Sequence, residues 1–153
     1  MKKIFIGMLM VLCSFGLQAA AGAAERGNAE DAVALVKQAI AYIKANGRDK
    51  AFAEFSSPSG KFRDRDMYIM VYDLQGNNKA HGANPRLVGK NLSGIKDADG
   101  KALFNAFLDS VNSPKGGGWV DYKWPNPVTG AIEPKTTYVE KFEDIMLGCG
   151  IYK

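Results

Sequence analysis

Residues 116–153 read GGGWVDYKWPNPVTGAIEPKTTYVEKFEDIMLGCGIYK, and this stretch decides the fold. It predicts three antiparallel strands, joined by a long proline-rich connection at residues 124–134 and by a tight turn at Glu143-Asp144. Aromatic residues crowd the first strand, whereas Gly148, Cys149 and Gly150 thin out the third. Large side chains that face small ones across a sheet can leave room for a ligand. They can also be the bulk that covers the core face, and these residues alone favour that second interpretation.

The chain before this stretch predicts helices and one hairpin. An amphipathic helix begins after Asn28, a capping residue, and ends near Asn46, with Gly47 as its stop. The segment MYIMVY is a strand that is apolar on both faces, so we expect it in the middle of the sheet. The remaining expected elements are a short helix, a turn, a returning strand and a third helix, at residues 49–55, 73–77, 78–81 and 101–112.

Three segments are expected to be irregular. Residues 62–66 (FRDRD) form a charged, solvated loop, and residues 82–91 (GANPRLVGKN) are too rich in turn formers for a helix. The segment KDADGK resembles part of a calcium loop, but Ile95 and Ala106 would occupy its first and twelfth ligand positions. We therefore expect a turn there. The fold class is α+β, with helices bracketing one antiparallel sheet of about five strands.

The N-terminus has the pattern of a secretory signal peptide. Lys2 and Lys3 precede an apolar run of 14 residues, which is short for a membrane span, and AAAGAA follows from residue 19. Cleavage is expected after Ala21 or Ala24, and an uncleaved membrane anchor is the alternative. Cys13 lacks the small preceding residue that lipoprotein processing needs. The predicted division is a signal peptide at residues 1–24 and one domain at residues 25–153.

Composition excludes several classes of function. Removal of residues 1–24 lowers the formal charge from +4 to +2, and no basic stripe indicates nucleic-acid binding. Only Cys149 then remains, so no internal disulfide is possible, and its alternation with Leu147 and Ile151 predicts a buried apolar residue. One histidine and one cysteine cannot build the usual metal sites, and no catalytic motif appears. We expect no cofactor, no enzyme activity and no further membrane span.

Four segments together resemble a known family. They are YIMVYDLQGNNKAHGANPRLVGKN, DADGK, WVDYKWPNPVTGAIEPKTTYV and the closing GCGIY. The whole is similar to the single Cache domain, the extracellular PAS-like sensor module of bacterial chemoreceptors and kinases. The resemblance implies a PAS-like sheet with the long N-terminal helix packed along it, and a pocket for a small ligand, often a short organic carboxylate.

The chain departs from membrane sensors of this type in one respect. Those sensors have a transmembrane helix on each side of the module, whereas this chain has a predicted cleavable signal and stops at Lys153. We therefore expect a free-standing exported domain, periplasmic or secreted. A membrane receptor or transporter is a candidate protein partner.

Few residues can bind a carboxylate, which needs cationic or hydrogen-bond donors inside apolar walls. His81 and Lys135 match places where the resemblance implies ligand contacts, and His81 could act as His⁺ or as a neutral donor. A structural histidine and a solvated lysine are the alternatives. Strict alternation puts Lys135 and Tyr138 on opposite faces, so both reach one pocket only if Lys135 precedes regular pairing. The other candidates are a wall of Tyr122 and Trp124, and, with weaker support, Trp119 and Arg86.

The sequence therefore predicts an exported sensor domain that binds a small organic acid reversibly. The alternative is an interaction module that partners a membrane sensor or transporter and has no small ligand of its own. A plugged pocket or a large exposed apolar patch would favour that alternative.

Overall fold

The computed structural model describes residues 25–153, so the predicted signal peptide lies outside the described residues. This part of the chain forms three α-helices, a short 3₁₀ turn (η1) and a six-stranded sheet. In chain order the elements are α1 (Ala29–Asn46), α2 (Arg48–Ser56), β1 (Arg63–Asp64), β2 (Met67–Asp73), β3 (Asn78–His81), η1 (Pro85–Leu87), α3 (Leu103–Val111), β4 (Gly117–Pro125), β5 (Ile132–Phe142) and β6 (Ile145–Tyr152). No helix within residues 25–153 is long and apolar enough to cross a membrane.

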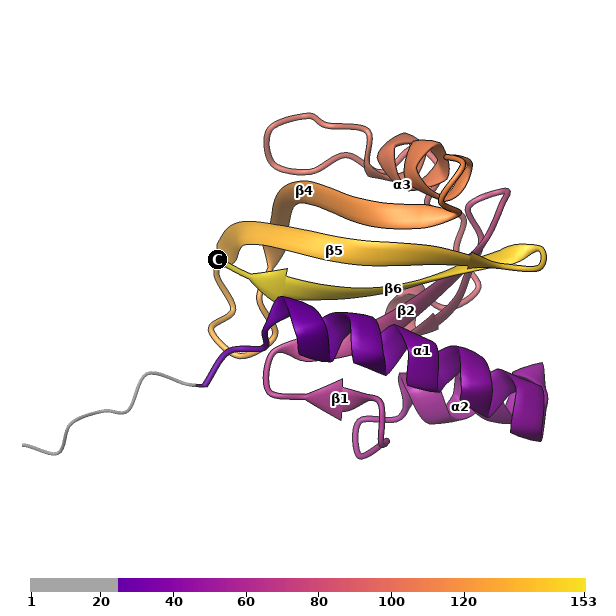
Figure 1. Ribbon diagram of the computed structural model, residues 1–153. Coiled ribbons are helices and arrows are strands. Elements are labelled where there is room, and N and C mark those ends of the chain that lie inside the picture. Colours follow the sequence, from indigo (N-terminus) through magenta and orange to yellow (C-terminus); the bar gives the residue numbers. More distant parts are fainter. Residues whose placement is uncertain (1–24) are drawn as a thin grey trace, which may run out of the picture.

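The sheet is antiparallel throughout and has the order β1-β2-β6-β5-β4, with β3 also paired to β2. Every residue of β2 is buried, which confirms the central position predicted from its apolar pattern. Figure 1 shows α1 and α2 along one face of the sheet and α3 across the other. The prediction of an α+β fold with a long helix packed along the sheet is confirmed.

The two faces of the sheet carry separate hydrophobic cores. On the face covered by α1 and α2, Ile69 and Leu147 are fully buried, and Cys149 is buried beside them. Burial raises the pKa of the Cys149 thiol to about 12, so it behaves as the small apolar residue that was predicted. On the face covered by α3, Met70 packs with Phe107 in the second core. Tyr122 and Trp124, the predicted pocket wall, belong to this second core.

Local capping explains where α1 begins and ends. The Asn28 side chain accepts a hydrogen bond from the Asp31 amide at 2.9 Å, as predicted. Gly47 has φ of 80° and its N–H donates to the Ile43 carbonyl at 2.8 Å, which ends the helix.

Two segments predicted to be irregular contain regular structure. Arg63 and Asp64 form the short strand β1, because they pair with Tyr68 and Met67 through a turn at Arg65. Pro85–Leu87 forms the 3₁₀ turn η1, which begins where the Asn84 side chain accepts from the Arg86 amide. Both are too short to leave a periodic pattern in the sequence.

The KDADGK segment is the predicted turn, and it covers the free edge of β4. Asp97 Oδ1 accepts from the amides of Asp99 and Lys101. Its Oδ2 accepts from the Lys123 amide at 3.1 Å, and Lys101 Nζ donates to the Asp121 carbonyl. Within residues 25–153, no group of three or more acidic, histidine or cysteine residues is placed to hold a metal ion.

Replacing Phe55 with alanine tests the core under α1 and α2. Phe55 is fully buried and packs edge-on against Phe62 with ring centroids 4.5 Å apart. We expect Phe55→Ala to lower the free energy of unfolding by about 3–5 kcal/mol, measured by urea denaturation. Phe52→Ala is the matched control, because Phe52 is only partly buried. Equal losses in the two variants would contradict this account of the core.

Candidate functional site

A buried lysine lies on the α3 side of the sheet. Lys135 is 2% exposed, and its Nζ donates to the hydroxyl oxygens of Tyr68 at 2.8 Å and of Tyr152 at 3.2 Å. The same nitrogen lies 4.1 Å and 4.5 Å from the centroids of these two rings. The aromatic faces and hydroxyl oxygens together replace part of the water that the ammonium loses on burial.

The glycines of β6 make this position possible. A Cβ on Gly150 would overlap Lys135 Cε and Thr137 Oγ1, so the lysine side chain crosses β6 where that strand has no side chain. A Cβ on Gly148 would come within 2.7 Å of Met70 Cε. The room left by these small residues is therefore filled by the protein's own side chains, which supports the core interpretation of the GCG segment.

Burial controls the charge of Lys135. Desolvation lowers its pKa to about 7, and the negative charge of Asp66 opposes that shift. Among the described residues, no carboxylate lies within ion-pair distance of its Nζ. An anion that came close would raise this pKa again, so anion binding and proton uptake by Lys135 are coupled.

His81 ends β3 and is a neutral hydrogen-bond donor. It is 2% exposed, and its Nδ1 accepts from the Asn84 amide at 3.0 Å, so in the neutral ring the proton lies on Nε2. Burial, and then the charge of Lys135, lower its pKa to about 3. Of the two forms considered from the sequence, the neutral one is therefore present at neutral pH.

Two adjacent hollows open beside these residues. The inner pocket lies between the sheet and α3 and has a free volume of about 10 Å³, close to the room that one water molecule needs. The outer pocket has about 230 Å³ and lies between residues 83–87 and residues 124–127. Tyr68, His81 and Trp124 line both pockets, so these three residues mark the boundary between them.

The structure brings four of the predicted residues together. His81, Tyr122 and Trp124 line the inner pocket, and Lys135 lies directly behind Tyr68, which lines it as well. The Tyr122 hydroxyl is 2.8 Å from Thr137 Oγ1, and burial raises the pKa of this tyrosine well above its usual range. The predicted wall of Tyr122 and Trp124 is present, with ring centroids 6.1 Å apart.

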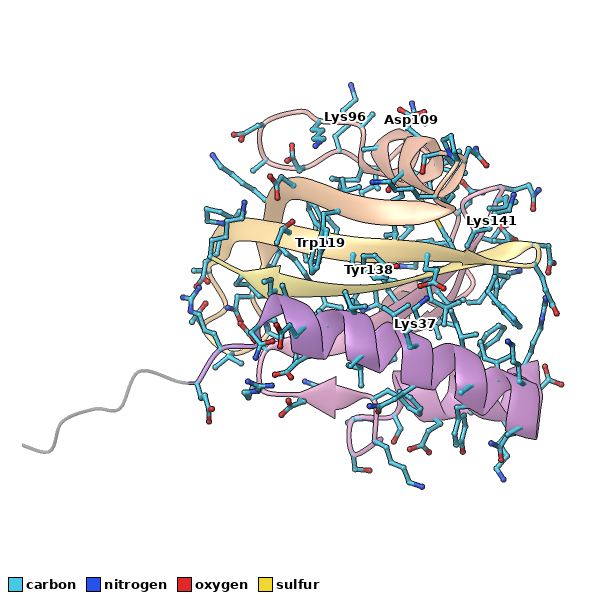
Figure 2. The ribbon with its side chains drawn as sticks, viewed as in Figure 1. Lys37, Lys96, Asp109, Trp119, Tyr138 and Lys141 are labelled. Atoms are coloured by element: carbon cyan, nitrogen blue, oxygen red, sulfur yellow. The ribbon has the colours of Figure 1, made fainter. Side chains whose placement is uncertain are left out.

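Besides Lys135, three predicted residues line neither pocket. Lys135 pairs regularly with Tyr122 and Tyr152, so alternation turns Tyr138 to the opposite face of the sheet. There Tyr138 packs 5.6 Å from Trp119 and donates to Glu140 at 2.9 Å. Figure 2 shows this aromatic pair on the face along which α1 runs. Arg86 is exposed on η1. We do not include these three residues in the site.

Tyr68 is the residue that the sequence reasoning missed. It accepts from Lys135 and lines both pockets, and its ring centroid is 4.9 Å from that of His81. The sequence does hold one indication of its role. Tyr68 places a hydroxyl inside a strand that is expected to be buried on both faces, and a buried hydroxyl needs a polar partner.

Comparison with known proteins identifies the fold. Residues 17–153 match the sequence profile of the family described as Single Cache domain 2. The chain belongs to the single Cache domain family. Cache domains are sensor modules of chemoreceptors and related proteins, as the relatives below illustrate.

Two curated relatives match this chain over a small part of their own length. The methyl-accepting chemotaxis protein McpP of Pseudomonas putida is 39% identical over 93 residues, which are 58% of this chain and 16% of the relative. The sensor histidine kinase MctS of Rhizobium johnstonii is 32% identical over 90 residues, which are 58% of this chain and 19% of the relative. The chain thus matches less than a fifth of either protein.

Solved Cache domains have the same fold. A methyl-accepting chemotaxis protein from Vibrio parahaemolyticus has a TM-score of 0.69 at 28% identity, covering 80% of this chain and 86% of that one. A Cache chemosensory domain described as a structural basis for carboxylic acid recognition has a TM-score of 0.64 at 31% identity, covering 80% and 86%.

Substitution of Gly150 tests the packing of the buried lysine. We expect Gly150→Ala to lower the free energy of unfolding by about 1–3 kcal/mol, because the added methyl group overlaps Lys135 and Thr137. Gly94→Ala is the control, since a Cβ there meets nothing within 4 Å. Urea denaturation of both variants measures the difference, and a neutral Gly150→Ala would mean that the lysine does not occupy this space.

The charge of Lys135 predicts a pH dependence of stability. Above about pH 7 the folded protein loses the Lys135 proton, whereas the unfolded chain keeps it up to about pH 10. Unfolding then takes up a proton, so the stability of the wild type relative to Lys135→Met rises between pH 7 and 10. The slope is at most about 1.4 kcal/mol per pH unit. Denaturation of both proteins at several pH values measures it, and a constant difference would contradict the lowered pKa.

Proposed function

We propose that this Cache domain reversibly binds a small organic carboxylate where its two pockets meet. The observation that carries the proposal is the buried Lys135, which has two tyrosine hydroxyls as partners and no carboxylate at ion-pair distance within residues 25–153. A buried cation without a counter-ion at contact distance is costly. A bound carboxylate would supply the missing negative charge.

The donors at the boundary suit a carboxylate. Because Lys135 donates to the Tyr68 oxygen, the Tyr68 proton can turn toward a ligand. The Nε2–H of His81 is a second donor, since Nδ1 is already used as an acceptor. Hydrogen bonds from two neutral donors, backed by a cation, bind a carboxylate more strongly than they bind a neutral amide.

The dimensions favour a short acid. The inner pocket is lined mainly by apolar and aromatic side chains, and its volume of about 10 Å³ has little room beyond a methyl group. The outer pocket is larger and has Asn84 and Asn126 on its wall. A short apolar tail would enter the inner pocket while the carboxylate stays at Tyr68 and His81. The neighbour described for carboxylic acid recognition supports this ligand class.

The family supports a proposal for the cellular role. Chemoreceptors and sensor kinases use this module, and one neighbour is described as a periplasmic sensor domain of a chemotaxis protein. We propose that this domain is exported to the periplasm. There it reports ligand occupancy to a membrane receptor or transporter.

The second candidate is an interaction module without a small ligand. The nearly filled inner pocket favours it, because a pocket already occupied by side chains needs no ligand. The outer pocket and the unpaired charge of Lys135 favour the carboxylate.

A thermal-shift panel separates the two functions. Residues 25–153 are screened against short carboxylates, each beside its primary amide, which matches it in shape without the charge. A carboxylate at 100 times its dissociation constant should add about 2.7 kcal/mol of stability. The amide should add little.

Variants then locate the site. We expect Lys135→Met and Tyr68→Phe to lower the affinity for the carboxylate at least tenfold, measured by calorimetry near pH 6.5. Trp119→Ala and Arg86→Ala are the controls, and both should bind as the wild type does. A folded wild type that responds to no carboxylate would overturn the proposal and favour the interaction module.

A further inference from the structure

Asp66 is a buried carboxylate whose hydrogen bonding is incomplete. It is 2% exposed and lies directly before β2. Its Oδ1 accepts from the Gly27 amide at 2.7 Å, but its Oδ2 is buried and has no hydrogen-bond partner among the described residues. Burying a carboxylate oxygen without a hydrogen-bond partner costs free energy, and a nearby positive charge reduces that cost.

Extending the strand register locates Asp66 near the strand ends that surround the buried lysine. β2 pairs Ile69 with Cys149, and extending that register by three residues puts Asp66 opposite Tyr152. Tyr152 in turn pairs with Lys135 on β5. Asp66 directly precedes β2 and lies two residues before Tyr68, whose hydroxyl accepts from Lys135.

We propose that Asp66 is a positioning residue, a counter-charge held in place by Gly27 that favours the protonated form of Lys135 while the pocket is empty. The attraction passes across the tyrosines and needs no direct contact. Its effect on ligand affinity rests on the proposed function, whereas its effect on the protonation of Lys135 does not.

The other ionisable groups around Lys135 are neutral near pH 7. Burial raises the pKa of the nearby tyrosines and of Cys149, and it lowers that of His81. The groups concerned come from the four strands around it: Tyr68 on β2, His81 on β3, Tyr122 on β4, and Cys149 and Tyr152 on β6. Asp66 is the one carboxylate whose charge raises the pKa of both Lys135 and Tyr152.

Asp66 has opposite effects on an anionic ligand at low and at high pH. Below the pKa of Lys135 the ammonium is charged in any case, so Asp66 only repels the anion. Above that pKa, Asp66 favours the charged lysine that the anion needs. Removing its charge should therefore weaken binding at high pH but not at low pH, a reversal that a purely structural role would not produce.

The first experiment needs no ligand. Protein with ¹³C at lysine Cε is titrated by NMR, and the Lys135 signal is assigned by its loss in Lys135→Met. We expect Asp66→Asn to lower the Lys135 titration midpoint by about one pH unit. Asp66→Glu should restore most of it. Asp64→Asn is the matched control, because Asp64 is exposed and paired with Arg65, and it should leave the midpoint unchanged. An unchanged midpoint in Asp66→Asn overturns the proposal.

A second measurement does not depend on the folding of Asp66→Asn. The ¹³Cγ signal of Asp66 in the wild type should show an inflection at the Lys135 midpoint, and this inflection should be missing in Lys135→Met. An Asp66 signal with no inflection at the Lys135 midpoint would refute the proposed interaction between the two residues.

Calorimetry with acetate completes the test. Asp66→Asn should bind about tenfold more weakly than the wild type at pH 8.5, and at least as tightly at pH 6. An equal loss of acetate affinity at both pH values would mean that Asp66 has only a structural role, and it would overturn the proposal. If the wild type itself binds no carboxylate, the proposed function fails, and the NMR titrations still decide the role of Asp66.

Discussion

The burial of one ammonium group constrains this domain more than any other interaction. Lys135 must lose most of its water, and the sheet supplies two tyrosine hydroxyls and two aromatic faces in return. The side chain can lie there only because β6 has Gly150 at the crossing point. A lysine that is only partly compensated responds strongly to a new negative charge, and this property makes the position suitable for sensing.

The sheet register assembles this arrangement from distant parts of the chain. Tyr68 and Lys135 lie 67 residues apart in sequence, and they meet because β6 pairs with both β2 and β5. A slip of one residue in β5 would turn Lys135 toward α1 and bring Thr136 into its place. The proposed carboxylate site therefore depends on the same hydrogen-bond ladder that determines the fold.

Local signals in the sequence predicted the helices and the long strands, whereas the site needed tertiary information. The Asn28 cap, the Gly47 stop and the buried strand β2 all follow from neighbouring residues, and they were predicted correctly. His81, Tyr122 and Trp124 do line the pocket. Tyr138 was grouped with them although alternation argued against it. Tyr68 escaped notice because its polar partner lies on a distant strand, and no local pattern reveals such a pair.

The KDADGK turn, which contains Asp97, protects part of the free edge of β4. A terminal strand such as β4 exposes a row of amides and carbonyls onto which a foreign strand can add. Here the Lys123 amide is occupied by Asp97 and the Asp121 carbonyl by Lys101. Two polar groups that would otherwise start such an addition are thereby occupied within the chain. The KDADGK segment, which resembles part of a calcium loop, thus hinders the β4 edge from acting as a template for aggregation.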